Sequence, residues 1–329
     1  MDYLLDVRNL EVDFAPETRS APVVDGVDLR VGQGEVVGVI GESGSGKTVT
    51  CMALLRLLPQ HAQVRADCAR FRDMELIELG ENEFDALRGR DLAMIFQDPV
   101  GSFNPVKTVG WHFRHVARRV TSKRPDLQGR GAWKASAVEL LRKVGIPHGQ
   151  QIIASYPHEL SGGMLQRALI ALVLQLRPAL IVADEPTTNL DNIVEFQIIE
   201  LFRLLRTETD ASFLFITHDI SLAARLCDRI VVMYAGQIVE DGSTRDVLDA
   251  PRHPYTQGLL RTATELEGKV DRLAEIPGEL PTITNMPSGC RFAPRCPQRQ
   301  AVCDQYQPMR TIAGERAVRC VLADSKGAL

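Results

Sequence analysis

A glycine-rich octet near the N-terminus has the residue types of a phosphate-binding loop. In VVGVIGESGSGKT, four residues separate Gly41 from Gly46, and Lys47 and Thr48 follow. Glycines let backbone N–H groups turn toward phosphate oxygens, a lysine at this spacing reaches the β- and γ-phosphates, and the hydroxyl beside it can hold Mg²⁺. The octet therefore predicts a nucleoside triphosphate site. The residues expected to bind the nucleotide here are Gly41, Ser43, Gly44, Gly46, Lys47 and Thr48.

The segments on either side of the octet have the patterns that such a loop needs. Residues 36–40 form a short apolar, β-branched run, which is typical of a strand buried on both faces, and VTCMALLRLL after the octet has helical apolar spacing. A chance glycine-rich turn would lack this strand and helix. The phosphate loop alone does not identify the function of the protein, because kinases, GTPases, motors and transport ATPases all have such a loop.

An acidic pair ends a second apolar run. Leu180 to Ala183 has the pattern of a buried strand, and Asp184 and Glu185 follow it directly in LIVADEPTTNLD. We expect Asp184 to hold Mg²⁺ and Glu185 to act as general base on the attacking water, a role typically worth ~10²–10⁴-fold in rate. Two such carboxylates can instead cap a helix. The presence of Lys47 favours the catalytic interpretation.

Ser161, Gly162 and Gly163 precede the helical pattern of MLQRALIALVL. A helix that begins this way presents free N–H groups and the positive end of its dipole to an anion. The first phosphate site has no use for a second phosphate-binding element. We therefore expect these three residues to complete the site of a neighbouring subunit.

With these motifs in this order, the chain resembles the ATP-binding subunits of ABC transporters over residues 3–329. The resemblance implies that Gln97 in MIFQDP lies in the loop that touches both Mg²⁺ and the transmembrane subunit. It implies that Asp191 belongs to a nucleotide-contacting D-loop, Asn189-Leu190-Asp191. It also implies that His218 in FLFITHD contacts the γ-phosphate, and this histidine ends a strand-like run, where open α/β sheets place ligand-contacting residues.

The resemblance further implies that Phe14, 27 positions before Gly41, stacks on the adenine of ATP, although a half-buried strand residue is an equally simple interpretation. Three residues depart from the usual family pattern: Met164 and Leu165 in the signature, and Asn189 in the D-loop. None of them removes a catalytic group. They leave open whether the composite site that uses this signature is fully competent.

Alternating strand and helix patterns must position these residues. Residues 101–177 lack strand alternation and carry helical runs such as WKASAVELLRKVGI, and RIVVMYAGQIVEDG predicts a hairpin that turns at Ala235-Gly236. The expected strands lie near 4–14, 24–31 and 36–40, with sheet patterns resuming at Leu180 and Phe213.

These patterns predict an α/β fold, and the resemblance implies a P-loop NTPase of the ABC type with a RecA-like core and a helical subdomain at about 101–177. We expect a nucleotide-binding domain over residues 1–262 and a small cysteine-containing C-terminal extension over 263–329.

The bulk composition is that of an ordinary globular protein. The formal net charge of −4 offers no general attraction to nucleic acid or to an anionic membrane. The chain has no apolar run near the ~18 residues of a spanning helix and no secretory signal pattern, so we expect a cytoplasmic protein. The resemblance implies a peripheral position on the cytoplasmic face of the bacterial inner membrane, where partners hold the protein.

The C-terminal part resembles the oligopeptide/dipeptide branch of ABC importers. His253-Pro254-Tyr255-Thr256 is followed by EIPGELPTITNMPSG at 275–289, whose prolines and glycines predict an extended connection. The resemblance implies four kinds of partner: a second, homologous ATPase, two permease subunits and an extracytoplasmic solute-binding protein. Importers of nickel, glutathione, opines or sugars remain alternatives, as does a soluble ABC ATPase of translation or DNA repair. A non-catalytic module with a vestigial site is disfavoured by the intact catalytic groups.

Four of the seven cysteines lie close to the C-terminus, and their spacing is Cys290-x5-Cys296-x6-Cys303-x16-Cys320. A disulfide set is disfavoured in a reducing compartment, and unlinked structural thiols would not need to cluster. Zinc sites usually have shorter Cys spacings, whereas iron–sulfur clusters tolerate wide ones. The resemblance to peptide importers implies a [4Fe–4S] cluster, and zinc remains the alternative.

Overall fold

The computed structural model describes residues 3–17, 21–120, 122–129, 131–188, 191–267 and 276–323. The chain forms two compact units. The first unit combines residues 1–78 with residues 215–329, and the second consists of residues 79–214. The first unit is therefore discontinuous in sequence.

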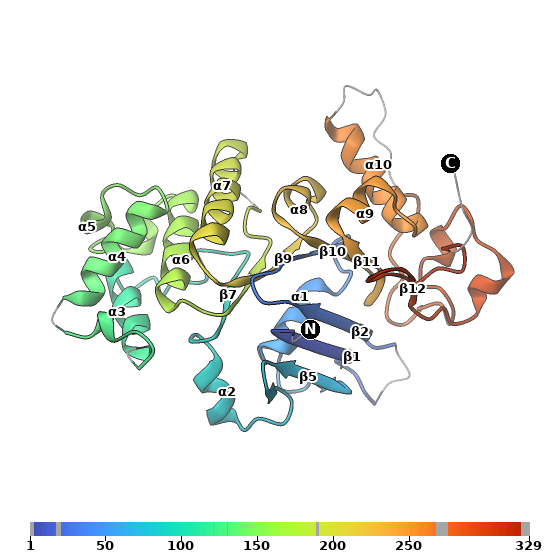
Figure 1. Cartoon of the computed structure of the whole chain (residues 1–329), viewed down its shortest axis with the longest axis horizontal. Coiled ribbons are helices and arrows are strands. Elements are labelled where there is room, and N and C mark those ends of the chain that lie inside the picture. The colour runs from blue at the N-terminus through green and yellow to red at the C-terminus, as the bar shows by residue number, and fades with distance from the viewer. Residues whose placement is uncertain are drawn as a thin grey trace. The chain divides into compact units, whose positions relative to one another are not determined.

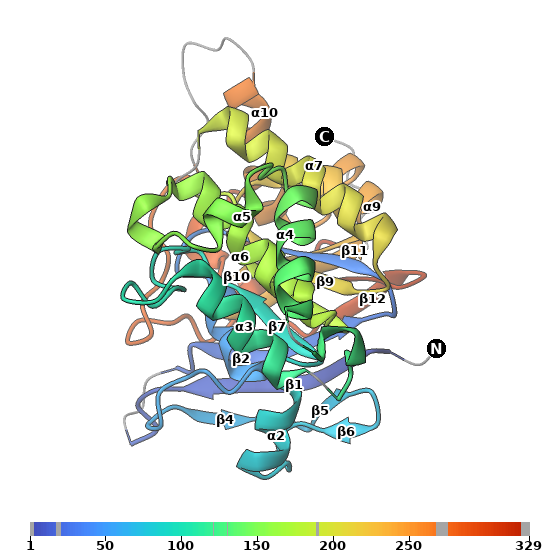
Figure 2. The same ribbon diagram turned by 90° about the vertical axis from the view of Figure 1, so that its left-hand side faces the viewer.

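An antiparallel sheet forms part of the first unit, and its described strands have the order β2-β1-β5-β6, with β4 also paired to β1. Figures 1 and 2 show β1, β2 and β5 lying side by side. Buried valines and leucines alternate with more exposed residues along β2, as a sheet with one covered face requires. The strands are β1 (Leu5–Asp13), β2 (Val24–Val31), β4 (Gln63–Arg65), β5 (Cys68–Phe71) and β6 (Met74–Glu75).

A second set of strands in this unit carries the phosphate loop. All five residues of β3 are buried, and β3 pairs in parallel with β10, which forms a hairpin with β11. The predicted turn is confirmed, because Ala235 and Gly236 have positive φ angles of 46° and 84°, the geometry that suits a two-residue hairpin. The order is β12-β13-β11-β10-β3, with β9 next to β3. The strands are β3 (Val36–Ile40), β9 (Ser212–Thr217), β10 (Arg229–Tyr234), β11 (Gln237–Ser243), β12 (Arg310–Ala313) and β13 (Arg316–Val318). The first three residues of β9 belong to the second unit.

The described helices of the first unit are α1 (Lys47–Leu54), α8 (Ile220–Leu226), α9 (Thr244–Asp249) and α10 (Pro254–Glu267), with short 3₁₀ turns at Ala293–Arg295 and Ala301–Asp304. The helix after the phosphate loop ends earlier than the pattern VTCMALLRLL suggested, because Arg56 adopts a left-handed conformation with φ 49°. The described part of the predicted connection, residues 276–289, has no helix or strand, which confirms that prediction.

The second unit contains the parallel pair β7 (Leu92–Ile95) and β8 (Leu180–Asp184), and α6 packs against β7. The helices α3 and α4 both pack against α6, and the described part of residues 101–177 contains no strand, as predicted. Figure 2 shows these three helices together. The helices are α2 (Glu81–Leu87), α3 (Val109–Arg119), α4 (Ala132–Lys143), α5 (Gly149–Ile152), α6 (Gly162–Leu176) and α7 (Asn192–Glu208), with 3₁₀ turns at Pro125–Leu127 and Pro157–Glu159.

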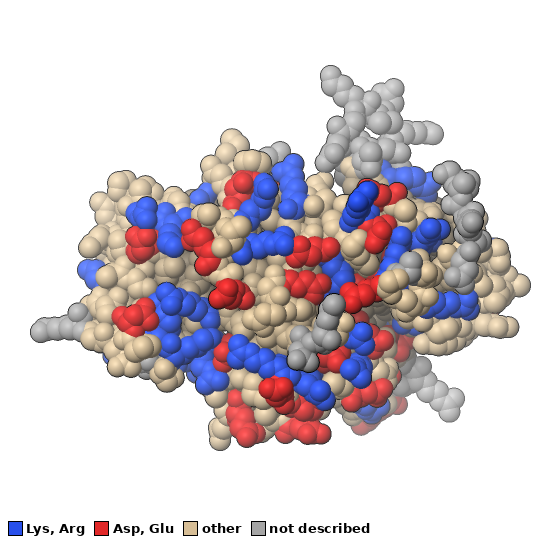
Figure 3. All heavy atoms as spheres, in the orientation of Figure 1, with Lys and Arg blue, Asp and Glu red and all other residues tan. Residues whose placement is uncertain are grey.

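Acidic and basic side chains are interspersed over the face shown in Figure 3. This distribution agrees with the modest net charge of −4. Among the helices that the structure describes, none combines the length and the apolar character needed to cross a membrane.

Candidate functional site

The phosphate loop joins β3 to α1 in the first unit, and its glycines are required by its backbone. Gly41 has φ 156°, and a Cβ atom on it would lie 2.2 Å from the backbone oxygen of Met233. Gly46 has φ 99°, another conformation that L side chains rarely adopt. The local fold therefore explains the glycine spacing that the sequence presents.

Lys47 lies inside this loop and is 4% exposed. Its ammonium group donates hydrogen bonds to the backbone oxygens of Gly41 at 2.8 Å and of Glu42 at 2.9 Å. Backbone carbonyls thus hold a positive charge where the loop wraps around it. The loop therefore holds a buried positive charge, which is compatible with the predicted phosphate site.

His218 and Phe14 are also in the first unit. His218 follows the last residue of β9 and is exposed, while Asp219 beside it caps α8 by accepting the N–H of Ser221 at 2.7 Å. Phe14 comes directly after β1, is half-buried, and has its ring centroid 5.9 Å from that of His61. The γ-phosphate and adenine contacts of His218 and Phe14 stay predictions.

In the second unit, the structure brings Gln97 and Glu185 together. The Glu185 carboxylate oxygen Oε2 accepts hydrogen bonds from Gln97 Nε2 and from Thr188 Oγ1, each at 2.9 Å. Glu185 itself has a left-handed backbone with φ 44°, and Asp184 before it is buried at the end of β8. Thr188 was not among the predicted site residues, and its signal in the sequence is no more than a hydroxyl three residues after Glu185.

The Ser-Gly-Gly motif begins α6, as predicted. Ser161 caps the helix by accepting the N–H of Met164 at 3.3 Å, and both Ser161 and Gly162 are exposed. A Cβ atom on Gly163 would lie 2.9 Å from Val194 Cγ1, so this glycine lets α7 pack closely. The N-terminal end of α6 is therefore exposed to solvent, and its phosphate contact stays a prediction.

Asp191 is the N-cap residue of α7. Its carboxylate caps α7 by accepting the N–H groups of Ile193 at 3.1 Å and of Val194 at 2.9 Å. The other two D-loop residues, Asn189 and Leu190, lie outside the described residues. A nucleotide contact by Asp191 stays a prediction.

The four C-terminal cysteines share one neighbourhood in the first unit. Burial, helped by the other three thiols, raises the pKa of Cys320 to about 11, and burial together with neighbouring cysteines raises the pKa of Cys290 and of Cys296. The sulfur of Cys303 accepts the N–H of Gln300 at 3.5 Å, and the sulfur of Cys320 accepts a backbone N–H from its own loop at 3.4 Å. Cys303 and Cys320 are buried, and Cys290 and Cys296 are half-buried. The four thiols lie close enough to affect one another's pKa.

This donor set suits a soft metal centre, because thiolates select zinc and iron–sulfur clusters. Across the described parts of the chain, however, no three His, Cys, Asp or Glu side chains are gathered as ligands of one metal ion. A cluster of several iron atoms is larger than a single ion and separates its thiolates more widely. The chemistry of the site thus fits a thiolate-bound centre, while a preformed single-ion cage is not observed among these residues.

Two protein families match the chain in adjoining regions. The ABC transporter family matches residues 24–188, and the C-terminal region of the oligopeptide/dipeptide transporter family matches residues 239–303. The oligopeptide transport ATP-binding protein AppD of Bacillus subtilis is 40% identical over 331 residues, covering 100% of this chain and 99% of that protein. The dipeptide transport ATP-binding protein DppD of Haemophilus influenzae is 42% identical over 317 residues, covering 96% and 94%.

Solved structures show the same fold at lower identity. The cassette MJ0796 in a post-hydrolysis state with ADP and phosphate has a TM-score of 0.59 and 23% identity, covering 73% of this chain and 99% of that one. The structure of cbiO1 from Clostridium perfringens has a TM-score of 0.60 and 22% identity, covering 76% and 92%.

Proposed function

Because this chain belongs to the family of ABC transporter ATP-binding proteins, we propose that it powers an importer of dipeptides or oligopeptides by hydrolysing ATP. The chain is an ABC-type ATPase, and the finer proposal concerns its cargo and its partners. One observation carries the proposal. The ABC transporter family and the oligopeptide/dipeptide C-terminal family both match this one chain, which is similar to AppD over 100% of this chain and 99% of that protein.

In the proposed mechanism, the loop from Gly41 to Thr48 wraps the β- and γ-phosphates with its N–H groups. The Lys47 ammonium, already held by two loop carbonyls, neutralises their charge. Thr48, Gln97 and Asp184 would hold Mg²⁺, which when bound supplies positive charge to the phosphates. Phe14 would stack on the adenine.

Glu185 takes a proton from the attacking water. Gln97 and Thr188 orient its carboxylate through the two hydrogen bonds at 2.9 Å. His218 would contact the γ-phosphate as its charge develops. To accept a proton, the Glu185 carboxylate must form a hydrogen bond with the attacking water. The hydrogen bonds from Gln97 and Thr188 therefore also control its ability to act as a base.

We propose that two ATPase subunits meet head to tail, with Ser161, Gly162 and Gly163 of one facing the nucleotide of the other. The exposed start of α6 supports this, since a helix N-terminus open to solvent can receive a phosphate from a neighbour. In the proposed dimer, Asp191 would also lie near the nucleotide. The second subunit would be a homologous ATPase, and the pair would drive two permease subunits fed by an extracytoplasmic solute-binding protein, at the cytoplasmic face of the bacterial inner membrane.

We propose that Cys290, Cys296, Cys303 and Cys320 hold a [4Fe–4S] cluster, with zinc as the alternative. Their shared neighbourhood and backbone N–H···S contacts support a metal centre of thiolates. Iron and sulfide analysis after anaerobic purification tests the assignment. Stoichiometric zinc without visible absorbance would exclude the cluster.

The variant Glu185→Gln tests the ATPase mechanism in the assembled complex. We expect it to retain bound ATP and to lose steady-state turnover, because an amide cannot accept the proton. The matched control is Glu139→Gln, an exposed carboxylate on α4 paired with Arg142. Turnover and transport at the wild-type level in Glu185→Gln would contradict the mechanism.

Cargo is tested by a different experiment. Complexes assembled with candidate binding proteins are compared for the ATPase rate that each ligand-loaded protein stimulates. Stimulation by a peptide-loaded protein is expected. Stimulation only by nickel-, glutathione-, opine- or sugar-loaded proteins would replace the peptide assignment and leave the ATPase mechanism in place.

A further inference from the structure

We propose that Tyr255 and Arg295, from the C-terminal part of the chain, are positioning residues of the phosphate loop. Both contact Glu42, the second residue of the loop. This inference rests on the proposed binding of ATP by that loop. It assigns a direct part in shaping the nucleotide site to Arg295 in the extension and to Tyr255 just before it.

Tyr255 fixes the backbone of Glu42. The Glu42 N–H donates to the Tyr255 hydroxyl at 2.9 Å, and Tyr255 is fully buried. Its ring lies against Tyr234 and Phe292, with centroid distances of 4.6 and 5.4 Å. Burial raises the pKa of Tyr255, so its hydroxyl is neutral at neutral pH. A rigid aromatic cluster therefore holds the loop at the point where its chain leaves Gly41.

Arg295 neutralises the Glu42 side chain. Its guanidinium donates to Glu42 Oε2 at 2.9 Å, and its side chain is only 6% exposed. A carboxylate within an anion-binding loop would repel a triphosphate, because like charges a few ångströms apart interact strongly near a protein surface. The ion pair removes that repulsion.

The arginine is itself held in place. It donates to the backbone oxygens of Ile276 at 2.9 Å and Pro277 at 3.0 Å, in the connection that precedes the cysteines. In the same connection, Leu280 lies 3.9 Å from where a side chain on Gly44 would begin. The connection and the cysteine segment thus form one support for the loop.

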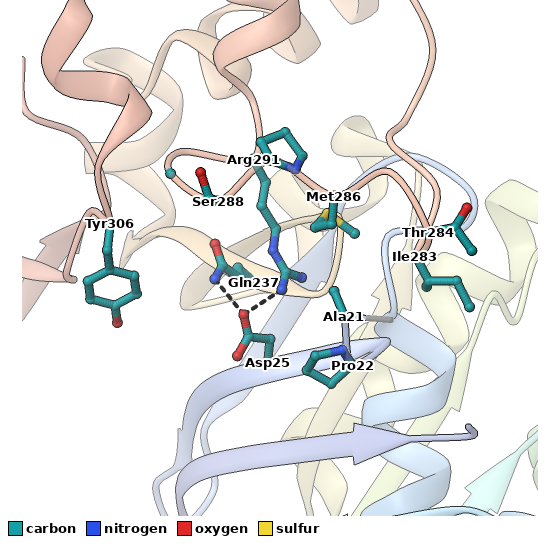
Figure 4. A pocket seen from close by; sticks show the side chains of 12 residues that line it. Ala21, Pro22, Asp25, Gln237, Ile283, Thr284, Met286, Ser288, Arg291 and Tyr306 are labelled. Atoms are coloured by element: carbon teal, nitrogen blue, oxygen red, sulfur yellow. Dashed lines mark hydrogen bonds and ion pairs between the residues drawn. The ribbon is translucent and has the colours of Figure 1, made fainter. Parts of the chain in front are cut away.

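A second arginine supports the loop indirectly. Arg291 donates to the backbone oxygen of Ala235 and to the carboxylate of Asp25, and Figure 4 shows it directed at Asp25 beside Gln237. The next residue after Ala235, Gly236, donates its N–H to the Ser45 oxygen at 2.8 Å. Arg291 and Arg295 both lie between Cys290 and Cys296, so this short segment carries both supports.

The test compares KM and kcat for ATP in the assembled complex. Arg295→Met leaves the Glu42 charge without its partner, and we expect KM for ATP to rise roughly 10-fold while kcat changes less than about 3-fold. Arg295→Lys, which keeps the charge, should recover most of the loss. The rise in KM should become smaller as salt is added, because salt screens the charge of Glu42, whose side chain is 28% exposed.

Glu42→Gln supplies the decisive second variant. It keeps the N–H that Tyr255 accepts and removes the charge, so the double variant Glu42→Gln/Arg295→Met should return KM to within about 3-fold of wild type.

Tyr255→Phe keeps the ring and removes the acceptor, and a KM increase of roughly 3- to 10-fold is expected. Arg299→Met is the matched control in the same segment, because Arg299 pairs with Asp304 at an exposed position.

A KM for Arg295→Met that equals wild type, or a double variant no better than Arg295→Met, would overturn the proposal. If Arg295→Met fails to fold, Glu42→Gln alone decides, because the proposal expects it to bind ATP at least as tightly as wild type. Wild-type complexes without any ATPase activity would instead refute the proposed function.

Discussion

Two adjacent glycines at the start of α6 have different surroundings. A Cβ atom on Gly162 would meet no atom within 4 Å, whereas one on Gly163 would lie 2.9 Å from Val194 Cγ1. Adjacent positions of the same motif are therefore constrained for different reasons. Gly163 is set by packing within its unit, while Gly162 is free of such a contact, so the proposed phosphate contact is its remaining reason to be glycine.

This difference predicts opposite effects on stability. Gly162→Ala should raise the free energy of unfolding by up to about 1 kcal/mol through helix propensity. Gly163→Ala should lower it by roughly 1–3 kcal/mol through overpacking. Urea unfolding of both variants measures the difference, and Val194→Ala should rescue Gly163→Ala only. Equal stabilities for the two alanine variants would contradict the packing argument.

Protonation of His253 is expected to destabilise the first unit at acidic pH. It is 1% exposed, its Nδ1 accepts the Tyr255 N–H, its own N–H donates to the buried Glu240, and burial with nearby Arg319 lowers its pKa from 6.5 to about 3. The unfolded chain therefore binds this proton more tightly than the folded chain. Stability from His253 is complete above pH 6.5 and is lost as the pH falls toward 3.

We expect His253→Asn, which keeps an acceptor for the Tyr255 N–H, to flatten this acid slope. The wild-type free energy of unfolding should fall by up to about 1.4 kcal/mol per pH unit more steeply than that of the variant within the window. Urea unfolding at a series of pH values from 7 to 4 measures this slope. Parallel curves for the two proteins would show that His253 is not the group responsible.

At the scale of elements, α7 depends on a residue that the family resemblance assigns to the nucleotide. The Asp191 carboxylate accepts two N–H groups of the first turn of α7. Asparagine caps helices about as well as aspartate, whereas replacing a cap by alanine costs about 1 kcal/mol. The capping role and a charge-dependent role can therefore be separated.

Asp191→Ala should lower the free energy of unfolding by about 1 kcal/mol, and Asp191→Asn should leave it within about 0.5 kcal/mol of wild type. If Asp191 also acts at the nucleotide through its charge, the asparagine variant should still lose ATPase rate in the assembled complex. Thermal unfolding and steady-state rates are compared on the same preparations. A cap effect of equal size in both variants would contradict the hydrogen bonds described.

The long, regular elements could be predicted from their patterns. The strands at 24–31 and 36–40 have the bounds expected, because β-branched runs bounded by glycine have a clear period. The strands β4 and β6, of 3 and 2 residues, have no such period. The site residues close in sequence were predictable, but Glu42 meets Tyr255 and Arg295 across 213 and 253 positions, and no local pattern encodes such contacts.

At the scale of the whole molecule, the C-terminal extension is part of the first unit's sheet. The strand β13 pairs with β11, and Arg316 donates to Glu240 at 2.7 Å. Glu240 is fully buried and also accepts the backbone N–H groups of Arg252 and His253. Arg316 therefore neutralises a buried carboxylate of the first unit.

Arg316→Met should lower the free energy of unfolding by about 3–5 kcal/mol, because it leaves a buried charge without its partner. Adding Glu240→Gln should recover part of this loss, and Arg245→Met on α9, where the arginine side chain is 89% exposed, should stay within about 0.5 kcal/mol of wild type. Denaturant unfolding of the four proteins measures the pattern. A double variant less stable than Arg316→Met would contradict the charge argument.

The first unit is built from residues 1–78 and 215–329, and this division has a consequence for biosynthesis. The phosphate loop leaves the ribosome early, but Arg295 is 253 residues behind Glu42. At about 5–20 residues per second, the nascent loop waits on the order of tens of seconds for its support. The contiguous second unit can fold during that interval. A polypeptide that stops before Arg295 is therefore expected to bind ATP poorly, so an unfinished subunit would compete little with complete ones for the nucleotide.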